Sequence, residues 1–127
     1  MATRQKVKAA QRKLNADKRP RASAKYVRVA PRKVQIVLDL IRGKSVDDAL
    51  AIVMYTPKSA SPVVEKLLSS AIANAENNLE MDREMLYVAE CYANQGPTLK
   101  KYWARSHGRA DMIKKHTSHI TIVLDQK

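Results

Sequence analysis

The 127-residue chain contains one cysteine and three glycines, and each shortage disfavours a class of protein. The single Cys91 cannot form a disulfide within the chain, and no apolar stretch follows the basic N-terminal residues. The sequence therefore predicts neither secretion nor a membrane span, and an intracellular, reducing compartment is expected. Neither of the glycine-rich loops that cradle nucleotide phosphates, G-x-x-x-x-G-K-[ST] and G-x-G-x-x-G, is present, which disfavours nucleotide-dependent enzymes.

Acidic residues are also scarce, since 12 aspartates and glutamates face 24 lysines and arginines and leave a formal net charge of +12. Small soluble domains usually carry a charge of magnitude about 2 to 8. The excess lies in two blocks: residues 1–33 hold 12 basic and 1 acidic side chain, and residues 91–116 hold 6 and 1, whereas residues 34–90 are slightly acidic. A solvated protein surface mixes the two signs, so these blocks indicate a polyanionic partner, which we interpret as nucleic acid.

Large apolar side chains are rare near the N-terminus, where only Val7 and Leu14 follow the first methionine. A helix that lies on a membrane surface needs a face rich in Leu, Trp or Phe, so membrane binding is disfavoured. We predict that residues 1–20 form a basic extension, disordered in the free protein, that orders on a polyanion. Because 45% of the chain is hydrophobic, residues 21–127 are expected to fold as a single domain. The basic blocks predict that this domain binds nucleic acid, and the family resemblance described below implies that it is a single RNA-binding domain.

Between the two basic blocks, apolar residues recur at helical spacing in three segments. The sequence therefore predicts helices over 31–42 and 60–78, and a short turn or helix over 45–53. Pro31 suits the first turn of the first helix because its missing N–H costs no hydrogen bond, and Gly43 suits the position after its end.

Beyond the helices, residues 86–93 and 120–124 are rich in β-branched and aromatic side chains and predict two strands. Antiparallel pairing centred near Glu90 and Ile122 puts the midpoint of their connection near residue 106. The two strands are therefore expected to be the arms of one hairpin.

The predicted hairpin covers about 86–124, with its tip at about 99–109. Arms of about 14 residues would reach roughly 45 Å at about 3.3 Å per residue, beyond a body with a radius of gyration of roughly 14 Å. The segment 98–109 interleaves cations with two aromatic residues, which suits contact with RNA. A mobile loop, or a helical turn over 109–115, is the alternative.

Three histidines, His107, His116 and His119, are candidates for acid–base chemistry. Histidines in such basic sequence more often contact phosphates or bases, or form hydrogen bonds at strand ends, so no catalytic residue is assigned. No C-x-x-C or H-x-x-x-H spacing accompanies them, so neither a metal site nor a cofactor is predicted.

Four separated blocks of the sequence carry a family resemblance. They are Tyr26-Val27-Arg28 with Pro31-Arg32-Lys33; Asp39-Leu40-Ile41-Arg42-Gly43-Lys44; the run Ser70–Asn78; and, in the hairpin, Lys100, Arg105-Ser106, Gly108-Arg109 and His119-Ile120-x-Ile122-x-Leu124. On these residues the chain resembles the bacterial-type family of large-subunit ribosomal proteins numbered twenty-two, over about residues 20–125.

The resemblance implies an α+β fold, in which three helices pack on a small three-stranded antiparallel sheet with a long projecting β-hairpin. It places the third strand near 22–29. It also implies a cytoplasmic, non-enzymatic constituent of the large ribosomal subunit that binds large-subunit rRNA and aids its assembly. The hairpin would line the nascent-peptide exit tunnel near protein four of the same subunit, so rRNA, other large-subunit proteins and the nascent peptide are the expected partners. The alternative is a non-ribosomal nucleic-acid-binding protein, such as a nucleoid protein or an RNA chaperone.

The residues expected to bind RNA are the cations, aromatic residues and histidines of the two basic blocks: Arg21, Lys25, Arg28, Arg32, Lys33, Lys100, Lys101, Tyr102, Trp103, Arg105, His107, Arg109, Lys114, Lys115, His116 and His119. The residues expected at the tunnel wall form the hairpin tip: Leu99, Lys100, Lys101, Tyr102, Trp103, Ala104 and Arg105. Ala104 stands where the family commonly has a proline, which bears on the rigidity of the tip.

Overall fold

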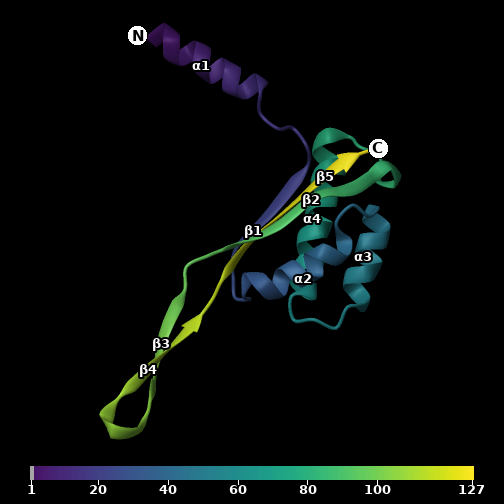
Figure 1. Cartoon of the computed structure of the whole chain (residues 1–127). Coiled ribbons are helices and arrows are strands. Elements are labelled where there is room, and N and C mark those ends of the chain that lie inside the picture. Colours follow the sequence, from purple (N-terminus) through teal and green to yellow (C-terminus); the bar gives the residue numbers. More distant parts are fainter. Residues whose placement is uncertain (1) are drawn as a thin grey trace.

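A three-stranded antiparallel sheet and three helices form the body of the molecule, in a computed structural model that describes residues 2–127 (Figure 1). The sheet has the order β1-β5-β2, with β1 at Arg21–Val27, β2 at Leu86–Gln95 and β5 at Ser118–Gln126. The helices of the body are α2 (Pro31–Ile41), α3 (Val46–Tyr55) and α4 (Ser61–Leu79), and a short 3-10 turn, η1 (Arg83–Met85), leads into β2. Outside the body lie helix α1 (Ala2–Leu14) and a two-stranded ribbon of β3 (Leu99–Ala104) and β4 (Ala110–Lys115), joined by the 3-10 turn η2 (Ser106–Gly108).

The three helices predicted for the body are confirmed, and their ends follow from local chemistry. Pro31 stands in the first turn of α2, and Gly43, just past its end, has a φ of 75° that a glycine adopts without strain. At the start of α3, Ser45 Oγ accepts a hydrogen bond from the Asp48 N–H at 3.3 Å, which caps the helix. The capping serine therefore fixes the boundary between the first two helices of the body.

Helix α1 is a fourth helix, where the sequence predicted a disordered extension. It contains neither glycine nor proline and is built mostly from Ala, Gln, Lys, Arg and Leu, which have high helix propensity. A scarcity of apolar side chains predicts that a segment is not buried. It does not determine the local conformation of the backbone. Met1, the first residue of the predicted extension, lies outside the described residues.

The hydrophobic core lies between the helices and one face of the sheet. Helices α2 and α4 pack on the strands, and α3 packs against both helices. Alternate residues of β2 and β5 are buried on this face, whereas Tyr92 and its partner Thr121 lie on the opposite, more open face. The expected third strand near 22–29 is β1, which completes the sheet by pairing with β5.

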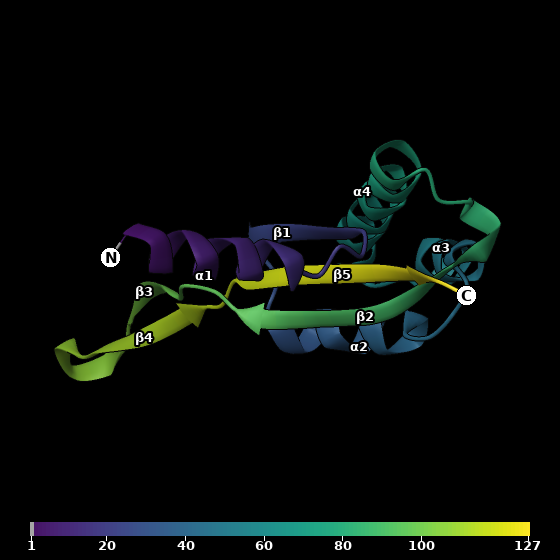
Figure 2. The same cartoon turned by 90° about the horizontal axis from the view of Figure 1, so that it is seen from above.

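The predicted hairpin is confirmed and projects beyond the helices, at the end of the sheet away from the C-terminus (Figures 1 and 2). In the sheet, Cys91 is paired with Ile122, one residue from the predicted register. The arms are not continuous strands: pairing breaks after Gln95 and resumes at Leu99 opposite Lys115. Residues 110–115 form β4, so the alternatives of a mobile loop or a helical turn are wrong.

The break between the body sheet and the ribbon is a hydrogen-bonded junction. The Gly96 N–H donates to the Thr117 carbonyl at 2.8 Å, and the Thr117 hydroxyl donates to the Pro97 carbonyl at 2.6 Å. Pro97 has no N–H to continue the ladder, so the side chain of buried Thr117 takes over part of the pairing. This junction sets the direction in which the ribbon leaves the body.

We expect Gly96→Ala to destabilise the junction. A Cβ at this position would lie 2.5 Å from Thr117 Oγ1, an atom that its hydrogen bond holds in place. Overpacking of this kind costs about 1–3 kcal/mol, measurable as a lower urea midpoint. Thr117→Ala in the same chain removes the clashing atom, so the double variant should lose less than the sum of the two single losses. Strictly additive losses would show that the two residues do not interact.

Candidate nucleic-acid interface

The ribbon presents all of its side chains to solvent. Every residue from Leu99 to His116 is exposed, including Tyr102 at 72% and Trp103 at 61%. In the ribbon, Lys101 is paired with Ile113 and Tyr102 with Met112, so one face carries Trp103 and the other carries Tyr102. Each face thus combines an aromatic ring with lysines, and the ribbon can contact partners on both sides.

The tip of the ribbon is a tight turn with its own ion pair. The Arg105 N–H donates to the Arg109 carbonyl at 2.8 Å, and the Arg105 guanidinium contacts the Asp111 carboxylate at 2.8 Å. His107 and Gly108 follow each other with φ values of 58° and 68°. Arg105 is therefore partly engaged within the ribbon, whereas His107 is exposed at its end.

Most of the predicted RNA-binding cations have no acidic partner within the described chain. Among residues 2–127, Arg19, Arg42 and Arg83 of the body form ion pairs with carboxylates. Of the lysines and arginines predicted to bind RNA, only Arg105 does so within that range. The remaining cations are exposed and uncompensated, as expected of side chains that await an external anion.

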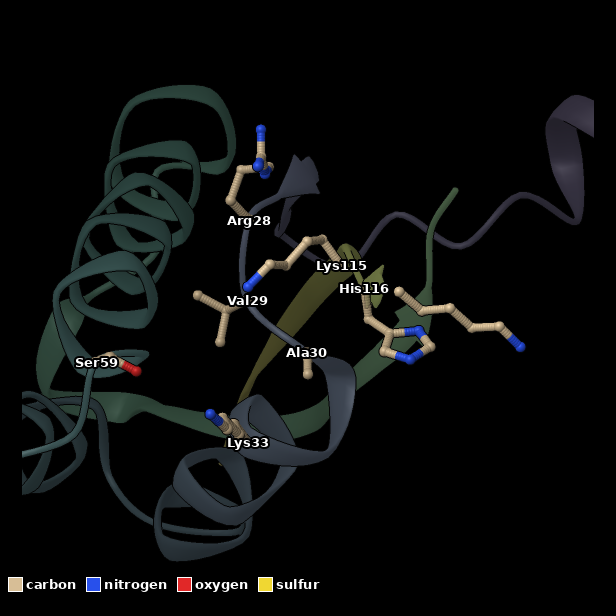
Figure 3. Close-up of a pocket in the computed structure, with 8 residues that line it drawn as sticks. Arg28, Val29, Ala30, Lys33, Ser59, Lys115 and His116 are labelled. Carbon is tan, nitrogen blue, oxygen red and sulfur yellow. The ribbon is translucent and has the colours of Figure 1, made fainter. Parts of the chain in front are cut away.

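A basic groove lies where the ribbon joins the body (Figure 3). Its main hollow has a volume of about 530 Å³, and two smaller hollows of about 280 and 240 Å³ adjoin it through shared residues. We define the basic groove by the polar and charged residues that line these hollows: Arg28, Arg32, Lys33, Lys58, Ser59, Gln95, Lys114, Lys115 and His116. No acidic residue of the described chain lines it, so it offers a concentrated positive field.

Three elements far apart in the sequence build the basic groove. The first turn of α2 supplies Lys33, the loop between α3 and α4 supplies Ser59, and the end of β4 supplies Lys115. In Figure 3 the side chains of Lys33 and Lys115 extend into the same space beside Ser59. Helix α2 starts here with no acidic side chain in its first turn, so the positive end of its dipole adds to the field. The groove is suited to the phosphates of a nucleic-acid backbone.

The predicted RNA-binding residues therefore fall into three places. Arg28, Arg32, Lys33, Lys114, Lys115 and His116 come together in the basic groove, and Lys100, Lys101, Tyr102, Trp103, Arg105, His107 and Arg109 lie along the ribbon and its tip. Arg21 and Lys25 are exposed on β1 instead. The residues predicted for the tunnel wall, 99–105, form β3 together with Arg105, which directly precedes η2.

His119 has a structural contact that sets it apart from the other predicted residues. It is half-buried, and its Nδ1 accepts a hydrogen bond from the Tyr26 N–H at 3.0 Å while the two rings meet edge to face. Tyr26 adopts a φ of 58°, an uncommon conformation for a residue with a side chain, and the bond to His119 helps to hold it. His119 is thus a strand-end hydrogen-bonding residue, and its contact with RNA stays a prediction.

Lys58 and Ser59 were missed from the sequence. Both lie in the loop between α3 and α4 and line the basic groove. Residues 34–90 mix charges of both signs, so a single lysine there gives no local signal. Only their position in the fold reveals them.

Outside the basic groove and the ribbon, the features to consider in the described chain are its cysteine, clusters of metal-ligating side chains and apolar helices. Cys91 is buried, its thiol donates to the Leu38 carbonyl at 3.4 Å, and burial raises the pKa of the thiol, so it packs as a core residue. Residues 2–127 contain no group of three or more histidine, cysteine or acidic side chains placed to hold a metal ion. None of the helices described is both long enough and apolar enough to cross a membrane.

Comparison with known proteins identifies the family. Residues 22–125 match the family described as ribosomal protein L22p/L17e. The large ribosomal subunit protein uL22 of Pelotomaculum thermopropionicum is 58% identical over 107 residues, which cover 84% of this chain and 95% of that protein. Its counterpart in Clostridium novyi is 60% identical over 107 residues, covering 84% of this chain and 96% of that protein. The matched range spans the body, the basic groove and the ribbon, and the chain therefore belongs to the ribosomal protein L22p/L17e family.

Proposed function

We propose that this ribosomal protein is a non-enzymatic structural constituent of the large subunit of the cytoplasmic ribosome. It binds large-subunit rRNA through the basic groove and the ribbon. The observation that carries the proposal is the meeting of a body cation, Lys33, with a hairpin cation, Lys115, in a hollow that no acidic residue of the described chain lines. Lysines that contact phosphates release condensed counterions, which gives affinity without reading base sequence.

The groove and the ribbon have complementary roles in this proposal. The groove holds an RNA backbone at the base of the hairpin and so helps to fix the ribbon's direction. Along the ribbon, Tyr102 and Trp103 lie on opposite faces, where exposed rings can stack on unpaired bases. An isolated two-stranded ribbon is marginally stable in water, so RNA packed against its faces would stabilise it.

The same geometry supports roles in assembly and in the exit tunnel. Because the ribbon projects beyond the helices, one chain can contact RNA segments that lie far from its body, which would help to organise them during assembly (Figure 1). A thin ribbon can pack one face on RNA while the other faces an open conduit. We propose that residues 99–105 line the nascent-peptide tunnel, with protein four of the subunit and the nascent peptide as neighbours.

Co-sedimentation tests the ribosomal assignment. After a high-salt wash, the tagged chain should migrate with large subunits at a stoichiometry of about one per particle. A chain that leaves the particles and is recovered with bulk nucleic acid would instead support the alternative of a free nucleoid protein or RNA chaperone.

Shortening the ribbon by two residue pairs tests the tunnel assignment. Deleting Tyr102-Trp103 together with their partners Asp111-Met112 shortens it by about 7 Å and keeps the remaining side chains on their faces. All four residues are exposed, so the melting temperature of the free protein should be unchanged. Ribosomes that contain the variant should show an altered response to macrolide-type antibiotics and fewer cross-links from nascent peptide to the ribbon.

The matched control is Ala110→Ser, which alters the exposed strand β4 without shortening the ribbon and lies outside residues 99–105. It should assemble, respond to macrolides and cross-link to nascent peptide as the parent does. An unchanged drug response and unchanged cross-linking in ribosomes that hold the shortened chain would show that the tip lies away from the tunnel.

A further inference from the structure

Helix α1 lies outside the residues that match the family, since the match begins at residue 22. It stands away from the body, connected by a short segment of chain (Figure 1). Every side chain from Thr3 to Leu14 is exposed. Helix α1 is therefore a feature separate from the basic groove and the ribbon.

The charge of α1 is of one sign and is arranged in a row. The helix has five basic and no acidic side chains. Arg4, Lys8 and Arg12 are four residues apart, so they lie along one face at intervals of about 6 Å and over a length of about 12 Å. Like charges at this spacing repel one another in an isolated helix. A row of phosphates would turn that repulsion into attraction.

The segment after α1 leaves these charges uncompensated. Asp17 is the one acidic residue among the first 33, and Arg19 binds its carboxylate at 2.7 Å and holds its pKa at about 2. Arg19 also pairs with Glu90 on β2 at 2.8 Å, and the Pro20 carbonyl accepts a hydrogen bond from the Leu124 N–H at 2.9 Å. The chain is thus fastened to the sheet at 19–20, and the carboxylate of Asp17 already has Arg19 as its cationic partner.

A membrane surface fits α1 less well than a nucleic acid. Its large apolar side chains are Val7 and Leu14, which lie two turns apart, and it has no aromatic residue. Helices that bind membrane surfaces bury a wide apolar face of Leu, Trp or Phe. The cationic row is the dominant feature of α1, and it complements a polyanion.

We propose that α1 is a separate RNA-binding element, whose Arg4–Lys8–Arg12 row docks on the phosphate backbone of an RNA duplex. A straight, regularly charged rod matches the regular phosphate rows of a duplex better than the irregular path of a single strand, and recognition of duplex RNA is mainly by shape and backbone contact. Only the source of the duplex, the large-subunit rRNA, rests on the proposed function. The element is tethered at residues 19–20 and binds apart from the basic groove.

The test compares two charge-matched triple variants of the full chain. One removes the row (Arg4→Gln, Lys8→Gln, Arg12→Gln), and the other removes three lysines outside it (Lys6→Gln, Lys13→Gln, Lys18→Gln). The probe is a 20-base-pair RNA duplex of arbitrary sequence, titrated over a series of KCl concentrations. We expect the first variant to bind roughly 10- to 100-fold more weakly at about 0.1 M KCl and to flatten the logarithmic salt slope by about 2 to 3. The second should lose much less.

A third variant, Ala10→Pro, distinguishes the contribution of the helical conformation from that of the charge, because it keeps every cation but breaks the helix. It should also weaken duplex binding if the row is needed in helical form. Equal losses from the two triple variants, or full affinity in Ala10→Pro, would overturn the proposal in favour of an unstructured charged tail. Loss of binding to phosphatidylglycerol vesicles in the first variant, with duplex affinity unchanged, would overturn it in favour of a membrane surface.

The proposed function and this inference fail independently. If the parent chain leaves washed large subunits but the row variant still loses duplex affinity, the ribosomal placement is wrong and the role of α1 stands. If the parent stays with the subunits and the row variant binds the duplex as the parent does, the role of α1 is wrong and the placement stands.

Discussion

The triple variant Lys33→Gln, Lys114→Gln, Lys115→Gln is expected to bind large-subunit rRNA roughly 100-fold more weakly than the parent at about 0.1 M salt. These lysines line one hollow of about 530 Å³, with no acidic residue of the described chain among its lining residues. If each contacts one phosphate, the logarithmic salt slope should flatten by about 2 to 3. Filter binding or fluorescence anisotropy over a KCl series measures both quantities.

The charge-matched control for this variant is Lys44→Gln, Lys66→Gln, Lys127→Gln. These lysines are exposed on the body and line none of the hollows of the basic groove. The control lowers the net charge by the same amount, so it should lose affinity only a few-fold if binding depends on the groove. Equal losses in the two variants would show that overall charge, rather than the groove, governs affinity.

Local patterns in the sequence were sufficient to predict the elements of the body and the hairpin. The ends predicted for the helix that begins at Pro31 and for strands β2 and β5 lie within about two residues of the observed ends. The pairing of Cys91 with Ile122 differs by one residue from the predicted register because the bulge between Val88 and Glu90 inserts an unpaired residue. A pattern of residue types carries no mark of such a bulge.

The basic groove shows what local patterns could not predict. Lys33 and Lys115 were each predicted to bind RNA, but their meeting depends on the junction at Gly96 and Thr117, which directs the ribbon. Ser59 joins them only because α4 packs against α2 and β1. The composition of a site built from three distant segments is a property of the tertiary fold.

The N-terminal residues illustrate the opposite case. Their charge and their scarcity of large apolar side chains predict a disordered tail that binds a polyanion, but residues 2–14 also have high helix propensity. In the structure the helix forms with every side chain from Thr3 to Leu14 exposed. Propensity and burial are separate contributions to helix formation, and α1 presents its charged row without burying a face.

Leu68→Ala is expected to destabilise the free protein by about 2–5 kcal/mol, a large share of the roughly 5–15 kcal/mol that stabilises a typical domain. Leu68 is 0% exposed, lies near the middle of α4 and belongs to the hydrophobic core. Removing three carbon atoms there leaves a cavity that close-packed neighbours fill only in part. Urea denaturation should show a lower midpoint with an unchanged slope. The control, Ser69→Ala, is exposed on the same helix and should change stability by less than about 0.5 kcal/mol.

The Leu68 variant also separates the roles of core and groove, because its basic groove is intact. A ligand that binds only the folded chain raises the free energy of unfolding by about 2.7 kcal/mol at a free concentration of 100 times its Kd. An rRNA fragment at that concentration should therefore restore much of the stability that Leu68→Ala removes. It should do little for the same variant combined with Lys33→Gln, Lys114→Gln and Lys115→Gln. Equal restoration in both backgrounds would mean that RNA stabilises the body from another surface, and no loss of stability in Leu68→Ala would mean that α4 does not bury this side chain.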